Sequence, residues 1–67
     1  MKIKEFRQAR GMTQQALADA VHVTKGAVSQ WENGLRVPDV STLLALADVF
    51  GVSLDNLVGR QPPEAAS

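Results

Sequence analysis

Apolar residues recur along the chain at intervals of three and four, and glycine or proline separates the segments in which they do so. This spacing is typical of amphipathic helices, and no four-residue run alternates cleanly as a half-buried strand would. The pattern predicts an all-α fold of five helices. The first three cover residues 2–10, 14–21 and 25–33, a fourth follows Pro38 and ends before Gly51, and a short fifth follows Ser53.

Each predicted helix has residues suited to its ends. Thr13, Thr24, Asp39 and Ser53 are expected to cap four N-termini, because short side-chain oxygens accept hydrogen bonds from the free amides there. Gly11, Gly34 and Gly51 are expected just after three C-termini, where glycine adopts the left-handed conformation without strain. The stripes expected to face the core are Ile3 and Phe6; Leu17, Ala18 and Val21; Leu43, Leu46, Ala47 and Phe50; and Leu54, Leu57 and Val58.

The length and composition limit what the chain can do. A chain of 67 residues forms one domain with a small core, which leaves little room for a buried catalytic cavity. It contains no cysteine, so disulfides, thiolate zinc sites and cysteine nucleophiles are excluded. The N-terminus is too charged for a signal peptide, and the apolar stretch over residues 40–50 is far shorter than the ~20 residues that cross a bilayer. We therefore expect a soluble cytoplasmic protein.

The C-terminal residues differ from the rest of the chain. After Gly59 the sequence has two prolines, Pro62 and Pro63, and no large apolar residue. Such a segment cannot bury enough surface to offset the entropy of ordering it. We expect one folded domain over residues 1–59 and a disordered tail over residues 60–67.

The formal net charge is zero, but the charges are unevenly distributed. Residues 1–36 carry six basic and three acidic side chains, whereas residues 37–67 carry one basic and four acidic side chains. This asymmetry is compatible with one face that meets phosphate and another that faces away from it, and alone it is a weak signal.

The predicted helix over residues 25–33 has a polar face without acids. At about 100° per residue, its apolar residues Ala27, Val28 and Trp31 fall on one arc. The opposite arc holds hydrogen-bonding side chains and one glycine, which are Lys25, Gly26, Ser29, Gln30 and Asn33. Lysine can bond guanine and glutamine can bond adenine at their major-groove edges. An ordinary solvated helix face remains the alternative interpretation.

Residues 13–34, TQQALADAVHVTKGAVSQWENG, closely resemble the helix-turn-helix of the phage repressor and Cro family, also called the XRE family. The flanking RGM at residues 10–12, FGVS at 50–53 and LDNL at 54–57 resemble that family too, so the resemblance covers residues 2–59. It implies a five-helix, lambda-repressor-like DNA-binding domain in which the second helix and the third form the motif. It also implies that the third helix enters the major groove.

The resemblance assigns roles to matching positions. It implies an ion pair between Arg7 and Glu32, and it places Ala18 where the second helix crosses the third. The implied base-contacting residues are Lys25, Gly26, Ser29 and Gln30. The implied phosphate-contacting residues are Arg10, Gln14, Thr24, Asn33 and Arg36. The expected dimer interface is the surface around the fifth helix, with Leu54, Leu57 and Val58 as candidates, together with the fourth helix, although a leucine there can equally belong to the core.

The chain departs from the family at two positions. The turn after the second helix often has glycine, and here it has His22, which tolerates a positive φ better than most residues. A role for His22 as a metal ligand or catalytic base remains a minor alternative. Gly26 stands where a larger side chain is frequent, and a glycine inside a helix costs about 1 kcal/mol relative to alanine.

Together these observations predict a sequence-specific transcriptional regulator, with repression as the expected mode, that binds double-stranded DNA as a homodimer on a palindrome. We expect no enzymatic activity, no cofactor, no metal, no membrane partner and no small-molecule effector domain. The alternative is an antitoxin or protein-interaction module that retains the fold, which the neutral net charge favours.

Overall fold

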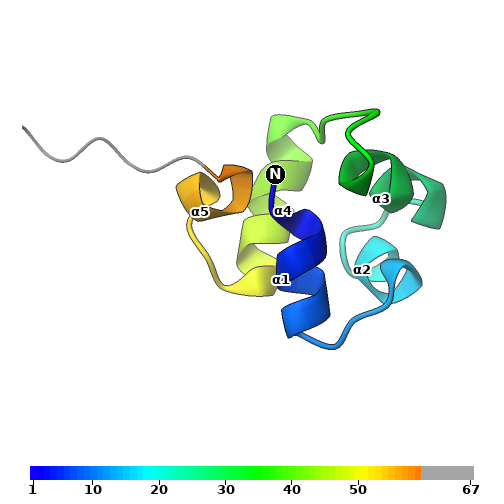
Figure 1. Ribbon diagram of the computed structural model, residues 1–67, viewed down its shortest axis with the longest axis horizontal. Coiled ribbons are helices and arrows are strands. Elements are labelled where there is room, and N and C mark those ends of the chain that lie inside the picture. The colour runs from blue at the N-terminus through cyan, green and yellow to red at the C-terminus, as the bar shows by residue number, and fades with distance from the viewer. Residues whose placement is uncertain (60–67) are drawn as a thin grey trace, which may run out of the picture.

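Five α-helices account for the regular structure of residues 1–59, the part of the chain that the computed structural model describes (Figure 1). In chain order the helices are α1 (Ile3–Ala9), α2 (Gln14–Ala20), α3 (Lys25–Glu32), α4 (Val40–Phe50) and α5 (Leu54–Val58). No strand occurs within these residues. The predicted all-α, five-helix fold is confirmed, with helix ends that differ by one or two residues from those expected. The predicted tail over residues 60–67 lies outside the described residues.

The four predicted N-caps are all present. The hydroxyls of Thr13 and Thr24 accept hydrogen bonds from backbone amides three residues ahead, at 3.0 and 3.1 Å. The Asp39 carboxylate accepts from the Thr42 amide at 2.8 Å, and Ser53 does the same for its helix at 3.1 Å. Each cap satisfies an amide that has no partner within its helix, which fixes where α2, α3, α4 and α5 begin.

The core lies where α1, α4 and α5 meet the pair formed by α2 and α3 (Figure 1). The rings of Phe6 and Phe50 join α1 to α4, with their centroids 5.7 Å apart. The Lys2 amide donates to the Leu57 carbonyl at 2.8 Å, which holds the start of the chain against α5. Among residues 1–59, nine apolar residues are buried, namely Ile3, Leu17, Ala18, Val21, Val28, Leu46, Ala47, Phe50 and Leu57.

The position of Leu57 corrects one prediction from the sequence. Leu57 was a candidate for a dimer interface, but its side chain is fully buried in the core of its own subunit. It cannot contact a second chain unless the domain unfolds. Leu54 on the same helix is exposed and Val58 is half-buried, so α5 points Leu57 inward and offers little apolar surface of its own.

The helices of the described residues are short. The longest, α4, has 11 residues, and none is long and apolar enough to cross a membrane.

Candidate nucleic-acid interface

The turn between α2 and α3 sets the angle between these two helices. His22 has a φ of 59°, the left-handed conformation expected at this position. The reversal lets the Val23 amide donate to the Ala18 carbonyl at 2.9 Å, and Thr24 then caps α3. Ala18 is fully buried, and its small side chain lets the backbones of the two helices approach closely. The turn therefore presents α3 at a fixed inclination across the end of α2.

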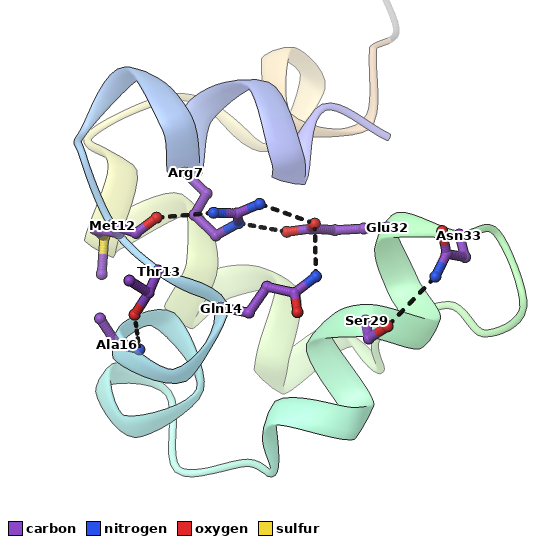
Figure 2. A network of polar contacts seen from close by, with 8 residues as sticks. All are labelled: Arg7, Met12, Thr13, Gln14, Ala16, Ser29, Glu32 and Asn33. Atoms are coloured by element: carbon purple, nitrogen blue, oxygen red, sulfur yellow. Dashed lines mark hydrogen bonds and ion pairs between the residues drawn. The ribbon is translucent and has the colours of Figure 1, made fainter.

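The outward face of α3 carries the residues that the sequence places there. Val28 is fully buried and anchors the helix, whereas Lys25, Gly26 and Gln30 are exposed. Ser29 is half-buried, and its hydroxyl accepts a hydrogen bond at 3.3 Å from the side-chain amide of Asn33 (Figure 2). The exposed face therefore presents one cation, one amide and one position without a side chain, and it contains no acid.

Nothing in the fold requires a glycine at position 26. A methyl group placed there would lie 3.8 Å from the Thr24 hydroxyl oxygen, an ordinary contact, and the backbone is helical. Glycine destabilises the interior of a helix by about 1 kcal/mol relative to alanine. The subunit itself gains nothing that offsets this cost.

Glu32, the only acid of α3, is turned away from the exposed face. Its carboxylate accepts from Arg7 Nε at 2.7 Å and from Arg7 Nη2 at 3.1 Å (Figure 2). Gln14 Nε2 donates to the same carboxylate at 3.1 Å, and Arg7 Nη1 donates to the Met12 carbonyl at 2.8 Å. The side chains of Arg7 and Glu32 are 11% and 4% exposed. One carboxylate therefore ties together α1, the start of α2 and the end of α3.

The electrostatics of this pair follow from burial and hydrogen bonding. Burial opposes the ionised form of Glu32, but the hydrogen bonds from Arg7 and Gln14 outweigh it, so the pKa of Glu32 lies below its ordinary value. The hydrogen bond to Glu32 raises the pKa of Arg7 above its ordinary value, although burial works against it. Both groups are therefore charged at neutral pH, and the negative charge stays inside the subunit.

Two of the predicted phosphate contacts are engaged within the subunit. The Gln14 side chain donates to Glu32, a hydrogen bond that the sequence did not predict. The Arg10 guanidinium donates to the Phe50 carbonyl at the C-terminal end of α4. Its positive charge stabilises that helix end, where carbonyls lack partners. Arg10 is exposed and is held at the end of α4, and its contact with phosphate stays a prediction.

The other predicted phosphate contacts lie at the two ends of α3. Thr24 precedes the helix and is exposed, while Asn33 and Arg36 follow it and are exposed. The amides of Leu35 and Arg36 both donate to the Gln30 carbonyl, at 2.9 and 3.3 Å. These bonds fold the loop that follows Gly34 back onto the end of α3. Exposed polar groups thus flank the exposed face of α3 on both sides.

A comparison with known protein families decides which kind of domain this is. A family model described as helix-turn-helix matches residues 3–57. The chain belongs to the helix-turn-helix family. The match spans all five helices, so it covers the fold as well as the motif formed by α2 and α3.

Several relatives of this helix-turn-helix chain are named transcriptional regulators. The chain is 37% identical to the regulator ImmR of Bacillus subtilis, and the match covers 88% of this chain and 46% of ImmR. It is 34% identical to the phage transcriptional repressor RstR of Vibrio cholerae, over 90% of this chain and 57% of the relative. It is 33% identical to the uncharacterised regulator YazB of B. subtilis, over 94% of this chain and 87% of the relative. The names of these relatives agree with the predicted class of function, DNA-binding regulation of transcription.

Most of these relatives are longer than the helix-turn-helix chain. It spans 29% of the transcriptional activator BcrR of Enterococcus faecalis and about half of most other relatives that it matches. No solved structure matches the chain significantly.

One feature of the domain was missed by the analysis of the sequence. Leu35, Val37, Val40 and Leu44 are large apolar residues that are half to three-quarters exposed. The pattern held a signal for two of them, because the apolar stripe of α4 that faces the core omits Val40 and Leu44. Leu35 and Val37 lie in the loop between α3 and α4, for which helical periodicity predicts nothing.

Proposed function

We propose that this chain binds double-stranded DNA in a sequence-specific manner by inserting α3 into the major groove. The observation that carries the proposal is the exposed face of α3, which holds Lys25, Gly26 and Gln30 while Glu32 is withdrawn into an ion pair. A groove lined by phosphates repels acids, so an acid-free face next to an internally neutralised carboxylate suits a polyanion. The major groove is wide enough to admit one helix.

The base contacts follow from the chemistry of the exposed side chains. Lys25 can donate to guanine O6 and N7, and Gln30 can form a bidentate pair with adenine. Gly26 lies between them along the helix and lets the backbone approach the base edges. Ser29 contributes less, because it is half-buried and already accepts a hydrogen bond from Asn33.

The phosphate contacts come from both ends of the recognition helix. Thr24 lies at its start, and Asn33 and Arg36 lie after its end, where they can bond the backbones that border the groove. Contacts of this kind fix the position of the helix and supply much of the affinity without reading sequence. Gln14 contributes by positioning Glu32 rather than by contacting phosphate, because its side-chain amide donates a hydrogen bond to the Glu32 carboxylate.

The domain is small for a specific binding site. One recognition helix reads few base pairs, so we expect two copies to bind a palindrome with half-sites one helical turn apart. We further propose that the protein represses transcription by occupying its site and that, like a regulator of its bacterial relatives' kind, it acts in the cytoplasm. The relatives include a protein named as a repressor and one named as an activator, so regulation in either direction has a precedent among them.

The proposal is tested by the salt dependence of DNA binding. Fluorescence anisotropy of labelled duplexes over a salt series should show an affinity that falls steeply with salt, as phosphate contacts require. Arg36→Ala should weaken binding to every duplex and reduce the slope by about one ion. Lys2→Ala is the matched control, because it removes the same charge beside Gly59 and should leave the slope unchanged.

The opposite result would point to another function. Equal slopes for the wild type, Arg36→Ala and Lys2→Ala, or no salt-dependent binding to any duplex in a random pool, would contradict the proposal. Such a result, together with a protein that co-purifies with the chain, would favour the interaction-module alternative.

A further inference from the structure

Ser29 and Asn33 form a hydrogen-bonded pair at the C-terminal end of α3 (Figure 2). The side-chain Nδ2 of Asn33 donates to the Ser29 hydroxyl oxygen at 3.3 Å, and the backbone amide of Asn33 donates to the Ser29 carbonyl at 3.0 Å. The same two residues are therefore joined through the backbone and through the side chains. The orientation of the Ser29 hydroxyl depends on Asn33.

The way in which α3 ends places the Asn33 side chain over Ser29. Gly34 has a φ of 73°, and the Leu35 amide donates back to the Gln30 carbonyl at 2.9 Å. A left-handed glycine with this bond is the Schellman pattern that ends many helices. The chain therefore leaves the helix directly after Asn33, whose side chain still lies over the preceding turn, as side chains on a helix do. Ser29 lies in that turn.

The bond from Asn33 leaves the Ser29 hydroxyl with its proton to donate. A serine hydroxyl has one O–H donor and two acceptor sites on its oxygen. Asn33 occupies one acceptor site, and no hydrogen bond among residues 1–59 uses the Ser29 O–H as its donor. Accepting a hydrogen bond polarises a hydroxyl and strengthens its donation to a further acceptor. Ser29 is thereby prepared to bond an acceptor outside the subunit.

We propose that Asn33 is a positioning residue for base recognition, which orients the Ser29 hydroxyl to donate to guanine in the major groove. The inference rests on the proposed function. Guanine presents two acceptors and no donor at this edge, whereas cytosine presents only a donor. A donating Ser29 therefore selects guanine over cytosine at the base that it faces. Lys25 lies one helical turn before Ser29 and Gln30 directly follows it, so this base belongs to the half-site that they contact.

The neighbouring glycine gives the Ser29 hydroxyl access to a base. Ser29 is half-buried and its side chain is short, so a base edge must come close to α3 to reach it. Gly26 is three residues earlier and therefore a neighbour on the helix surface. It is exposed, and a Cβ there would meet only the Thr24 hydroxyl oxygen, at 3.8 Å. The missing side chain leaves room for a base beside Ser29.

The pair with Ser29 does not use up the hydrogen-bonding capacity of Asn33. A carboxamide has two N–H donors, and Ser29 takes one of them. The other can still bond a phosphate, because Asn33 is exposed. The two roles differ in their effect on binding. A phosphate contact strengthens binding to every sequence alike, whereas a positioned Ser29 changes the preference at one base.

The test measures base preference in the duplex that the wild type selects from a random pool. Ser29→Ala identifies the position, because preference for guanine over cytosine should fall there by about fivefold, which corresponds to one neutral hydrogen bond. Asn33→Ala should lose preference at the same position by a similar factor, although Ser29 is still present. In the Ser29→Ala background, Asn33→Ala should cause no further loss of preference. The preference is the ratio of affinities for the two duplexes, measured by fluorescence anisotropy at one salt concentration.

Asn56→Ala is the matched control. It makes the same change at an exposed position of α5 and should leave the preference unchanged. Circular dichroism should show that all variants stay folded, because the replaced side chains lie outside the core.

The possible outcomes separate this inference from the proposed function. If Asn33→Ala weakened binding to both duplexes by the same factor, Asn33 would act on phosphate alone and its positioning role would be overturned. A wild type that selects a duplex whose base preferences are all unchanged by Ser29→Ala would overturn the base contact and leave the proposed function standing. A preference for cytosine at the position identified by Ser29→Ala would overturn the donor role of the hydroxyl. A wild type that selects no duplex would contradict the proposed function and this inference with it.

Discussion

Arg7 and Glu32 form a bidentate ion pair that joins the first helix to the third, with Nε–Oε2 and Nη2–Oε1 distances of 2.7 and 3.1 Å. The pair removes the only acidic group of α3 from the face proposed to meet DNA. It also sets the distance between α1 and α3, because Arg7 is fixed at the same time by the Met12 carbonyl. This single pair thus holds α1 against α3 and also keeps negative charge away from the exposed face of α3.

Removal of one partner of this pair should destabilise the domain strongly. Arg7→Ala or Glu32→Ala leaves an uncompensated charge that is largely shielded from water, at a cost of about 3 kcal/mol. Urea denaturation followed by circular dichroism measures this cost. A double change to apolar residues of similar volume, Arg7→Met with Glu32→Met, should recover most of the loss. Single variants as stable as the wild type would show that the pair lies in a more solvated setting.

Stability should fall on the acid side because the pKa of Glu32 is lowered. A carboxylate with a depressed folded pKa contributes its full stability above its unfolded pKa of about 4.3, and this contribution is lost as the pH falls towards the folded value. Denaturation midpoints between pH 7 and pH 5 should therefore be nearly constant and should decrease below about pH 4.3. Glu32→Gln should flatten this decrease. Asp39, whose pKa is lowered by the Thr42 amide, accounts for part of the slope that remains.

Gly26→Ala should have opposite effects on stability and on DNA binding. Alanine favours the helix by up to about 1 kcal/mol, and the added methyl group meets only the Thr24 hydroxyl, at 3.8 Å. The melting temperature should rise while affinity for the selected DNA site falls. Ser41→Ala, at an exposed position of α4, is the control that should raise stability without changing affinity. Unchanged DNA affinity in Gly26→Ala would show that the backbone does not approach the bases closely.

His22→Gly should leave DNA binding intact and stabilise the domain. His22 has a φ of 59°, where a side chain costs roughly 1–2 kcal/mol that glycine does not incur. The larger flexibility of glycine in the unfolded chain offsets part of this gain. His22→Val should destabilise the domain, since a β-branched side chain suits this conformation least. Thermal melts of the two variants should move in opposite directions, and shifts of the same sign would contradict this account of the turn.

Local features of this domain, such as helix caps and turns, were predictable from the sequence. Side-chain contacts between residues far apart in the sequence were not. The caps Thr13 and Ser53 depend only on residues next to them, and the turn at His22 depends on one backbone conformation. The hydrogen bond from Arg10 to the Phe50 carbonyl joins positions 40 residues apart, and a long side chain can reach several such partners.

The same distinction explains the error at Leu57. A helix of five residues carries too short a stripe to show which side faces the core, so the sequence left its leucines assigned to both core and interface. The ion pair between Arg7 and Glu32 was predictable only through the resemblance to a family. The exposed residues Leu35 and Val37 lie in a loop, where no periodic pattern exists to predict their exposure.

The most direct test of a DNA-reading α3 is the selection of bound duplexes from a random pool by the wild type and by Gln30→Ala. The wild type should enrich a palindromic sequence, and Gln30→Ala should enrich the same sequence with preference lost at one position in each half-site. Correct base contacts of this kind are worth about 1–3 kcal/mol each, so the loss should be clear in the selected pool. Identical sequence preferences for both proteins, or no enrichment by the wild type, would contradict the account.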